Sequence, residues 1–298
     1  MQLPSSFLKN IKAVDGDQGL LWLESLEHLI EDLSTQWGLS LVTPLQNLSF
    51  NFVATAKARA SETEVILKVS PPTRSVWNEV RWLRHYRKVT PTLLEFESLS
   101  NAFLLKRCHS GDTLRKRLPG MGDEAVTRVI CRTIKALRSS ATKDDSFRHL
   151  SDLISDFNAL EAFTDKRLFA KAQDLFGDLT RDRSQDILLH GDLHHENILS
   201  HEDDWLVIDP HGYQGHPAAE AGVMIYNPID GESDKVPSEA LLDQRFRILV
   251  EELQDDPQLI QAWCFCKAML SAAWNVKDFP RQSSREIEIA LRIEKWRF

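Results

Sequence analysis

The stretch Leu188-Leu189-His190-Gly191-Asp192-Leu193-His194-His195-Glu196-Asn197-Ile198-Leu199 decides the fold, together with Leu206-Val207-Ile208-Asp209 that follows it. Three of its side chains suit phosphoryl transfer at a spacing that few other chemistries explain. Asp192 is placed to take the proton from a substrate hydroxyl, and Asn197 and Asp209 are placed to hold Mg²⁺ against the phosphates of a nucleotide. The pattern therefore predicts a kinase active site.

The residues around this stretch predict the local structure that such a site needs. Residues 187–189 form a short apolar run that reads as a strand entering a catalytic loop. Residues 198–200 and 205–208 read as two strands around a polar turn, and this hairpin would return Asp209 to the side of Asn197. A Gly-Asp pair alone is common in polar turns, so the prediction depends on the whole pattern.

Length and composition are compatible with a two-lobed globular protein. The chain has 298 residues, of which 42% are hydrophobic, enough for a substantial buried core. No apolar run approaches the roughly 20 residues that span a bilayer, and the first 17 residues lack the basic start and apolar core of a secretory signal. The sequence therefore predicts a cytoplasmic protein without a membrane segment.

Charge and cysteine usage narrow the classes of partner. The formal net charge of −8 argues against a general nucleic-acid-binding surface and is compatible with a cationic small-molecule substrate, although such acidity more often serves solubility. The four cysteines show neither a disulfide framework nor zinc-site spacing, so we expect buried thiols: Cys108, Cys131, Cys264 and Cys266. Nothing in the sequence indicates an oligomeric state.

A candidate phosphate contact lies upstream of the loop. Residues 65–69 form a β-branched strand that carries Lys68, and after Pro71-Pro72 a helix begins near Trp77 with Glu79 off its apolar face. An ion pair between Glu79 and Lys68 would hold the lysine amine in place. Each residue taken separately reads as a solvated surface residue, but their order before the Asp192 loop favours a nucleotide site.

The segment before Lys68 lacks the glycines of a usual phosphate-binding loop. Residues 46–54 read Gln-Asn-Leu-Ser-Phe-Asn-Phe-Val-Ala. Ser49 and Asn51 favour a tight turn and are candidates to donate hydrogen bonds to phosphate, but an ordinary hairpin is equally compatible with the segment.

A lobe boundary is expected after the next apolar strand. Residues 102–105 are apolar and lead into Lys106-Arg107-Cys108, whose backbone is a candidate partner for an adenine edge. This position predicts a nucleotide-binding part over residues 1–107 and a catalytic and acceptor-binding part over residues 108–298.

At these motifs the chain resembles the aminoglycoside and hydroxyurea phosphotransferase family, especially its streptomycin-phosphorylating branch. The resemblance rests on the Asp192 loop, on Leu67-Lys68-Val69-Ser70-Pro71-Pro72 and on Ile208-Asp209-Pro210-His211-Gly212, with support from residues 22–38 and 270–274. It implies an α+β, bilobal, protein-kinase-like fold with a small β-rich N-lobe and a larger, mainly helical C-lobe.

The resemblance also implies the reaction and the site residues. The γ-phosphoryl group of ATP would pass to a hydroxyl of a small molecule, with streptomycin or another aminoglycoside as candidate acceptor and Mg²⁺ as cofactor. By position, Asp192 is then the catalytic base, Asn197 and Asp209 bind the metal, and Lys68 contacts the α- and β-phosphates. The role of Glu79 as the partner of Lys68 follows from its spacing alone.

Two departures from the family pattern weaken the transfer of acceptor specificity and catalytic efficiency. The phosphate loop has no glycine, and Ala218-Ala219-Glu220 stands where the family commonly has an aromatic residue followed by Asp. Closure of the site and the geometry of the acceptor depend on such surroundings.

The C-terminal part predicts a helical lobe and an acceptor loop. Tyr226-Asn227-Pro228, followed by Asp230, Glu232 and Asp234, forms an acidic turn that either pairs with a cationic acceptor or is a solvated loop. Six residues recur at helical spacing and form one stripe. We expect this stripe to be buried in the core rather than to stack against a ligand: Leu259, Trp263, Cys266, Leu270, Ala273 and Trp274.

Two other functions compete with an active kinase. A metal-dependent hydrolase would use the abundant histidines and aspartates of residues 190–211 as ligands, but has no use for Lys68 and Glu79. A catalytically weak or inactive kinase-like nucleotide-binding protein would explain the missing glycines, but the intact Asp192, Asn197 and Asp209 argue against it.

Overall fold

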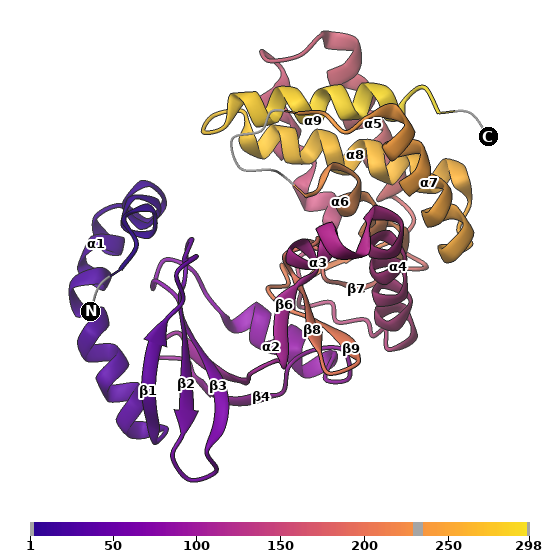
Figure 1. Ribbon diagram of the computed structural model, residues 1–298. Helices are drawn as coiled ribbons and strands as arrows, with labels where there is room; N and C mark the ends of the chain where they lie inside the picture. Colours follow the sequence, from indigo (N-terminus) through magenta and orange to yellow (C-terminus); the bar gives the residue numbers. More distant parts are fainter. Residues whose placement is uncertain (1–2, 229–234, 297–298) are drawn as a thin grey trace. The chain divides into compact units, whose positions relative to one another are not determined.

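The computed structural model describes residues 3–228 and 235–296. The chain divides into two compact units, Met1–Gly111 and Asp112–Phe298. The sequence prediction put a boundary after Arg107, a few residues before this division. The first unit combines helices with a sheet, and helices dominate the second (Figure 1).

From residue 3 on, where the structure describes it, the first unit contains two helices and five strands, and its last residues begin a sixth strand. Their bounds are α1 Ser5–Gln36, β1 Leu39–Pro44, β2 Phe52–Ala58, β3 Thr63–Val69, α2 Trp77–His85, β4 Leu93–Glu97, β5 Ala102–Lys106 and β6 Ser110–Thr113.

The second unit continues from β6 and holds the remaining elements. They are α3 Leu114–Met121, α4 Asp123–Ser139, the 3₁₀ segment η1 Leu150–Leu160, α5 Lys166–Leu179, β7 Ile187–Leu189, β8 Ile198–His201, β9 Asp204–Val207, β10 Tyr213–Gly215, the 3₁₀ segment η2 Pro217–Glu220, α6 Ala221–Tyr226, α7 Glu239–Leu253, α8 Pro257–Asn275 and α9 Pro280–Ile293.

An antiparallel five-stranded sheet organises the first unit, in the order β1-β2-β3-β5-β4. Strand β3 lies at its centre because its β-branched and aliphatic residues bury well on a pleated surface: Val65, Leu67 and Val69 are fully buried. The register pairs Lys68 with Val53 on β2 and with Phe103 on β5. The strand predicted to carry the phosphate lysine is thus the central strand.

Helix α1 covers the sheet with an apolar stripe whose members recur every three or four residues. Phe7, Ile11, Trp22, Leu26 and Leu33 belong to the same buried cluster as the sheet residues. The helix bends at a glycine, Gly16, with φ of 57°. Figure 1 shows the helix beside β1.

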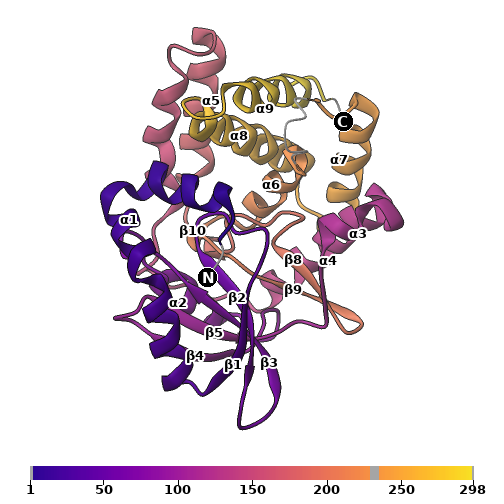
Figure 2. The same cartoon turned by 60° about the vertical axis from the view of Figure 1, so that its left-hand side comes forward.

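Helix α8 forms the centre of the second unit. It is buried at every position from Trp263 to Ala273 and packs against α5, α6, α9 and η1. An aromatic cluster joins these elements, since the ring of Phe176 lies 6.0 Å from that of Trp263 and 5.2 Å from that of Phe157. Figures 1 and 2 both show α8 and α9 side by side.

Two small sheets position the loop that the sequence singled out. Strand β7 pairs with β10, and β8 lies between β6 and β9. The predicted hairpin is confirmed, because Ile198 pairs with Val207 and His201 with Asp204. The loop of residues 190–197 therefore runs between β7 and β8.

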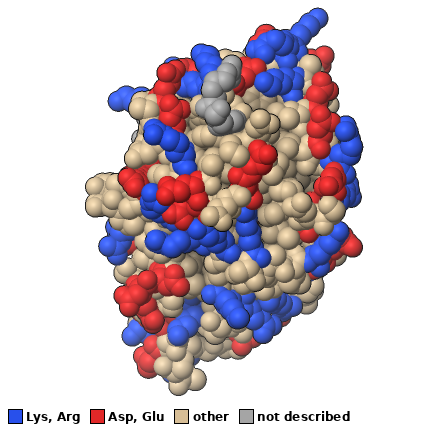
Figure 3. All heavy atoms as spheres, turned by 90° about the vertical axis from the view of Figure 1, so that its right-hand side faces the viewer, with Lys and Arg blue, Asp and Glu red and all other residues tan. Residues whose placement is uncertain are grey.

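The surface mixes charges of both signs. Figure 3 shows one face on which Lys and Arg side chains lie among Asp and Glu side chains. Arg128, for example, forms ion pairs with Glu124, Glu251 and Glu252. Among the described residues, no helix is long and apolar enough to cross a membrane. The four cysteines are buried free thiols, as predicted.

Candidate active site

The loop of residues 190–197 turns sharply at Gly191. This residue has φ of 85°, and a Cβ there would lie 2.7 Å from Cδ2 of Tyr213 on β10. Only glycine combines this backbone conformation with so close a neighbour. The turn directs the next residue, Asp192, out of the β7–β10 pair.

Asp192 and Asn197 contact each other across the loop. The Nδ2 atom of Asn197 donates to the Asp192 backbone oxygen at 2.9 Å and lies 3.2 Å from its Oδ2. Because the amide nitrogen faces Asp192, the Oδ1 atom of Asn197 faces away from that carboxylate. The loop thus holds one carboxylate and one amide side chain next to each other.

The hairpin returns Asp209 to the same loop. The N–H of Ile208 donates to the Asn197 carbonyl at 3.0 Å, and the N–H of His211 donates to the His190 carbonyl at 2.9 Å. Asp209 lies between these two attachments and has φ of 58°. The structure therefore brings Asp192, Asn197 and Asp209 together.

His190 is a structural link and not a ligand of the site. Its Nδ1 accepts from the Asp192 N–H at 3.3 Å, and its Nε2 lies 2.9 Å from the Ile208 carbonyl. Burial lowers the pKa of His190 to about 4, so the ring is neutral and Nε2 is the donor. The histidine ties the Asp192 end of the loop to Ile208, the residue that precedes Asp209.

Two further histidines surround the Asp192 carboxylate. The Nε2 atoms of His194 and His211 lie 3.4 Å and 3.8 Å from Asp192 Oδ2. Burial raises the pKa of Asp192, but the hydrogen bond from His194 and the charges of the histidines outweigh it, so that pKa is below its usual value. For His194, burial lowers the pKa, but the bond to Asp192 and nearby carboxylates raise it overall. Asp192 is therefore ionised at neutral pH.

Two buried charged residues, which sequence reasoning did not assign to the site, hold the start of the loop. The Glu220 carboxylate accepts from the N–H groups of His190 and Gly191, and Lys267 Nζ lies 3.2 Å from the Gly191 carbonyl oxygen. Burial raises the pKa of Glu220 to about 7. The acidic position after Ala218-Ala219 was a signal for Glu220, but no sequence pattern marked Lys267.

The ion pair predicted in the first unit is present. Lys68 Nζ lies 3.0 Å and 2.8 Å from the two carboxylate oxygens of Glu79 on α2. Both side chains are largely buried, with exposed fractions of 8% and 13%. Charge-assisted bonds in such surroundings hold the lysine amine in one place.

The segment before β2 is tied to the end of β3. Asn51 Oδ1 accepts a hydrogen bond from Ser70 Oγ at 2.7 Å, and the Ser49 carbonyl accepts from Asn10 on α1 at 3.1 Å. Side-chain contacts thus order this segment without glycine.

Two backbone amides of the candidate adenine-binding segment already donate hydrogen bonds within the first unit. The N–H of Lys106 donates to the Thr92 carbonyl at 2.9 Å, and the N–H of Arg107 donates to the Glu64 carbonyl at 3.0 Å. Among the three amides of residues 106–108, the Cys108 N–H is the remaining candidate donor. The Cys108 side chain is buried, which raises its pKa to about 11.

The chemistry of the donor atoms fits a magnesium ion. Asn197 Oδ1 and the Asp209 carboxylate are hard oxygen donors, and Mg²⁺ characteristically takes one or two carboxylates and completes its shell with phosphate and water. In the part of the chain that the structure describes, no group of three or more His, Cys, Asp or Glu side chains is arranged to hold a metal.

The model of the aminoglycoside/hydroxyurea antibiotic resistance kinase family matches residues 42–279, most of the chain. The chain belongs to this family. It is therefore a phosphotransferase, which excludes the alternative of a metal-dependent hydrolase. The histidines of that alternative instead serve the loop, as His190 illustrates.

Relatives of this chain include two streptomycin kinases. The streptomycin 6-kinase of Streptomyces glaucescens is 23% identical over 292 residues, which cover 93% of this chain and 92% of that protein. The streptomycin 3''-kinase of Klebsiella pneumoniae is 32% identical over 198 residues, which cover 61% of this chain and 70% of that protein.

Solved structures of other small-molecule kinases share the fold. Choline kinase LicA of Streptococcus pneumoniae superposes with a TM-score of 0.63 at 13% identity, covering 91% of this chain and 99% of that one. Aminoglycoside phosphotransferase APH(4)-Ia also gives 0.63, at 16% identity, covering 89% and 99%. The predicted α+β, protein-kinase-like fold is confirmed.

One C-terminal prediction needs correction, and another falls outside the described residues. Trp263 is buried as predicted, but Trp274 is 39% exposed, because it lies at the end of α8 where the covering elements stop. Asp230, Glu232 and Asp234 lie outside the residues that the structure describes.

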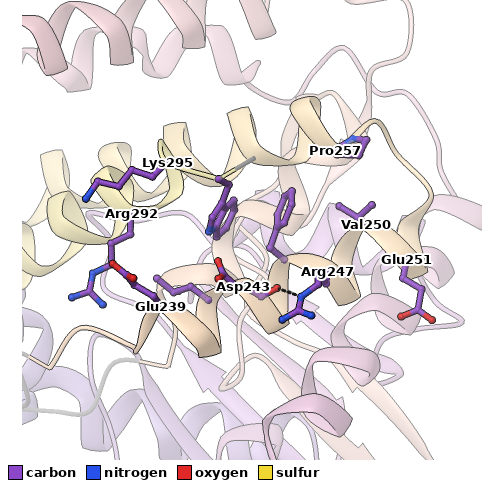
Figure 4. A pocket seen from close by; sticks show the side chains of 11 residues that line it. Glu239, Asp243, Arg247, Val250, Glu251, Pro257, Arg292 and Lys295 are labelled. Carbon is purple, nitrogen blue, oxygen red and sulfur yellow. Dashed lines mark hydrogen bonds between the residues drawn. The ribbon is translucent and has the colours of Figure 1, made fainter. Parts of the chain in front are cut away.

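A separate hollow of about 650 Å³ lies among α7, the start of α8 and the residues after α9. Figure 4 shows charged groups of both signs at its rim, with Asp243 and Arg247 joined by a hydrogen bond through the Asp243 carbonyl. None of the residues assigned to the active site lines it.

Proposed function

We propose that this kinase transfers the γ-phosphoryl group of ATP to a hydroxyl of a small, cationic acceptor, with an aminoglycoside such as streptomycin as the first candidate. The similarity of the chain to two streptomycin kinases supports the acceptor class. The excess of negative charge on the chain is compatible with such an acceptor. A cytoplasmic location belongs to this proposal.

The arrangement around Asp192 carries the proposal. An ionised carboxylate lies beside an amide and a second carboxylate, all fixed by backbone hydrogen bonds of one loop and one hairpin. In this assignment Asp192 accepts the proton of the acceptor hydroxyl, while Asn197 Oδ1 and Asp209 hold Mg²⁺. Mg²⁺ would neutralise charge on the phosphates.

The first unit would supply the remaining nucleotide contacts. Lys68, held by Glu79, is assigned to the α- and β-phosphates. The segment with Ser49 and Asn51 would cover the phosphates through its backbone, because the Asn51 Oδ1 atom already accepts from Ser70. The backbone of Lys106 to Cys108 is assigned to the adenine edge, with the Cys108 N–H as its donor.

The acceptor would lie near Asp192 in the second unit, along residues of several different elements. His211 lies 3.8 Å from Asp192, and its ring lies 6.0 Å from that of Tyr213. Burial raises the pKa of Tyr213, and the charges of Asp156 and Asp192 add to this effect. Trp274 Nε1 donates to Asp156 Oδ2 at 2.8 Å. A carboxylate beside an exposed aromatic ring suits a guanidinium or ammonium group.

The test is a survey of acceptors with the purified protein. ATP consumption is measured with streptomycin, other aminoglycosides, amino alcohols and neutral sugars. The masses of the products are measured by mass spectrometry. The proposal expects Mg²⁺-dependent turnover and the gain of one phosphoryl group by a cationic acceptor. Background consumption with every acceptor, while ATP binds, would contradict it.

That last outcome would favour the second candidate, a kinase-like protein that binds nucleotide without efficient turnover. The glycine-free segment of residues 46–54 supports it, since side-chain bonds hold a segment that has to approach the phosphates closely. The intact Asp192, Asn197 and Asp209 support the active kinase.

A further inference from the structure

Two buried residues, one acidic and one basic, contact the two peptide groups that flank the Cα atom of Gly191, next to Asp192. Lys267 on α8 is 2% exposed and Glu220 at the end of η2 is 3% exposed. Glu220 accepts from the Gly191 N–H at 3.3 Å, while Lys267 donates to the Gly191 carbonyl at 3.2 Å. Gly191 is thereby held at both ends of its backbone.

Burying these charges is costly, so their presence calls for an explanation. Burial lowers the pKa of Lys267, against the fields of Glu220 and Asp192, which raise it. A buried charge is tolerated when it is paired and hydrogen-bonded. A Met side chain would fill much the same volume without this cost, so packing alone does not account for a lysine here.

The packing of α6 against α8 makes room for the lysine. A Cβ at Gly222 would lie 2.6 Å from Cγ of Lys267 and 2.7 Å from the Trp263 carbonyl oxygen. The close approach of the two helices, which only a residue without a side chain permits, directs the lysine stem toward the loop.

We propose that Lys267 is a positioning residue of the phosphotransferase: together with Glu220 it fixes the backbone of Gly191 on both sides of its Cα atom and, through it, the direction of the Asp192 carboxylate. This inference rests on the proposed role of Asp192 as the base. A small misplacement of a catalytic group lowers the rate on the order of 10²-fold. The charge of Lys267 is then needed for turnover and not for the fold.

The pair also predicts a change in pH dependence when it is broken. The groups that face Glu220 are Lys267, the N–H groups of His190 and Gly191, and Arg138 on α4. Burial raises the pKa of Glu220, and the charge of Lys267 lowers it. Removing the lysine charge therefore raises the pKa of Glu220 further. A protonated Glu220 is a poorer acceptor for two N–H groups, so the acid limb of kcat moves to higher pH.

The variants are Lys267→Met, Lys267→Arg, Glu220→Gln and the double variant Lys267→Met with Glu220→Gln. The matched control is Lys135→Met, which removes a lysine that pairs with Glu252 near the surface. We expect Lys267→Met to lower kcat on the order of 10²-fold and to leave the KM for ATP within about twofold. The acid limb of the kcat–pH profile of Lys267→Met should shift to higher pH by about one unit.

The other variants distinguish positioning from packing. Lys267→Arg should recover part of kcat, because it keeps the charge. The double variant should unfold at a higher temperature than Lys267→Met, because it buries no unpaired charge, yet it should retain the loss of kcat. Wild-type kcat in a folded double variant would overturn the inference. The double variant can be measured even if Lys267→Met alone fails to fold.

A readout independent of turnover separates this inference from the proposed function. Hydrogen exchange of residues 188–199 should be faster in Lys267→Met than in the wild type and in Lys135→Met. If the wild type phosphorylates no acceptor, the proposed function fails and exchange still tests the positioning role. If the wild type is active and Lys267→Met matches it in kcat, pH profile and exchange, the inference fails.

Discussion

At the scale of single residues, the site is a set of side chains whose protonation is fixed by their neighbours. Asp192 is ionised beside His194, whereas His190 is neutral because it is buried. The first can accept a proton, and the second carries out a purely structural task between Asp192 and Ile208. Each assignment makes a different prediction.

Asp192→Asn should lower kcat by about 10² to 10⁴, because the acceptor hydroxyl loses its base. The Kd for Mg-ATP should stay within about threefold of the wild type, because Asp192 is assigned to the acceptor and not to the metal. Steady-state kinetics and calorimetric titration with nucleotide separate the two quantities. Asp178→Asn, which alters an exposed carboxylate paired with Arg181, is the control. Unchanged turnover would remove Asp192 from its role.

His190 predicts a loss of stability toward acid pH. Its pKa is about 4 in the folded protein and about 6.5 in an unfolded chain, so the unfolded state binds more protons between these values. The free energy of unfolding therefore falls as the pH falls through this window, by roughly 3 kcal/mol for this residue. His190→Gln should flatten that slope in urea titrations at pH 7, 5.5 and 4.5.

Glu220 acts in the opposite sense between pH 4.5 and 7, since its pKa is raised to about 7, but both proteins contain it. The difference between wild type and His190→Gln thus isolates the histidine. Parallel slopes would show that His190 is not buried in its neutral form.

At the scale of elements, the contact between the residue 46–54 segment and β3 is open to test. Ser70→Ala removes the donor to Asn51 Oδ1. We expect the KM for ATP to rise about fivefold, in line with about 1 kcal/mol for one hydrogen bond. Ser40→Ala on β1, whose hydroxyl bonds the Lys57 carbonyl at 3.4 Å, should leave this KM unchanged. An unaltered KM in Ser70→Ala would exclude the segment from nucleotide binding.

In the proposed acceptor site, Asp156 on η1 accepts a hydrogen bond from Trp274 at the end of α8. Asp156→Asn keeps an oxygen for the indole N–H and removes the charge. The KM for a cationic acceptor should rise about fivefold, since a partly exposed ion pair contributes about 1 kcal/mol. A neutral sugar that serves as acceptor is the control, and its KM should not change. An equal rise for both acceptors would point to a packing defect.

Local features of the fold and site were predictable from the sequence, whereas distant contacts were not. The strand of Lys68, the helix of Glu79 and the hairpin before Asp209 follow from residue periodicity and turn chemistry. The contacts of Glu220 and Lys267 with the loop join residues 30 and 76 positions apart. Their pairing arises only when η2 and α8 pack beside β7, which no short pattern encodes.

At the scale of the whole molecule, each unit folds its own part of the proposed site. The Lys68–Glu79 pair lies within the first unit, and the Asp192 loop with Asp209 lies within the second. Mg-ATP that binds the protein should raise its unfolding temperature. At 100 times its Kd the nucleotide contributes about 2.7 kcal/mol.

Lys68→Met and Asp209→Asn, changed in different units, should each reduce this thermal shift at a fixed nucleotide concentration. The Mg²⁺-dependent part should be lost in Asp209→Asn. Lys57→Met on β2, whose amine pairs loosely with Glu62 at 3.8 Å, is the control. A full shift in both site variants would contradict the metal and phosphate assignments.

The four buried thiols give the molecule a built-in reporter of its own opening. Burial raises the pKa of Cys108 in the first unit to about 11 and that of Cys131 in the second to about 12. Alkylation needs a thiolate that the reagent can reach, so these groups become reactive only when their surroundings loosen. Mapping which cysteine is modified first would therefore reveal the sequence in which the two halves melt, without adding a foreign dye.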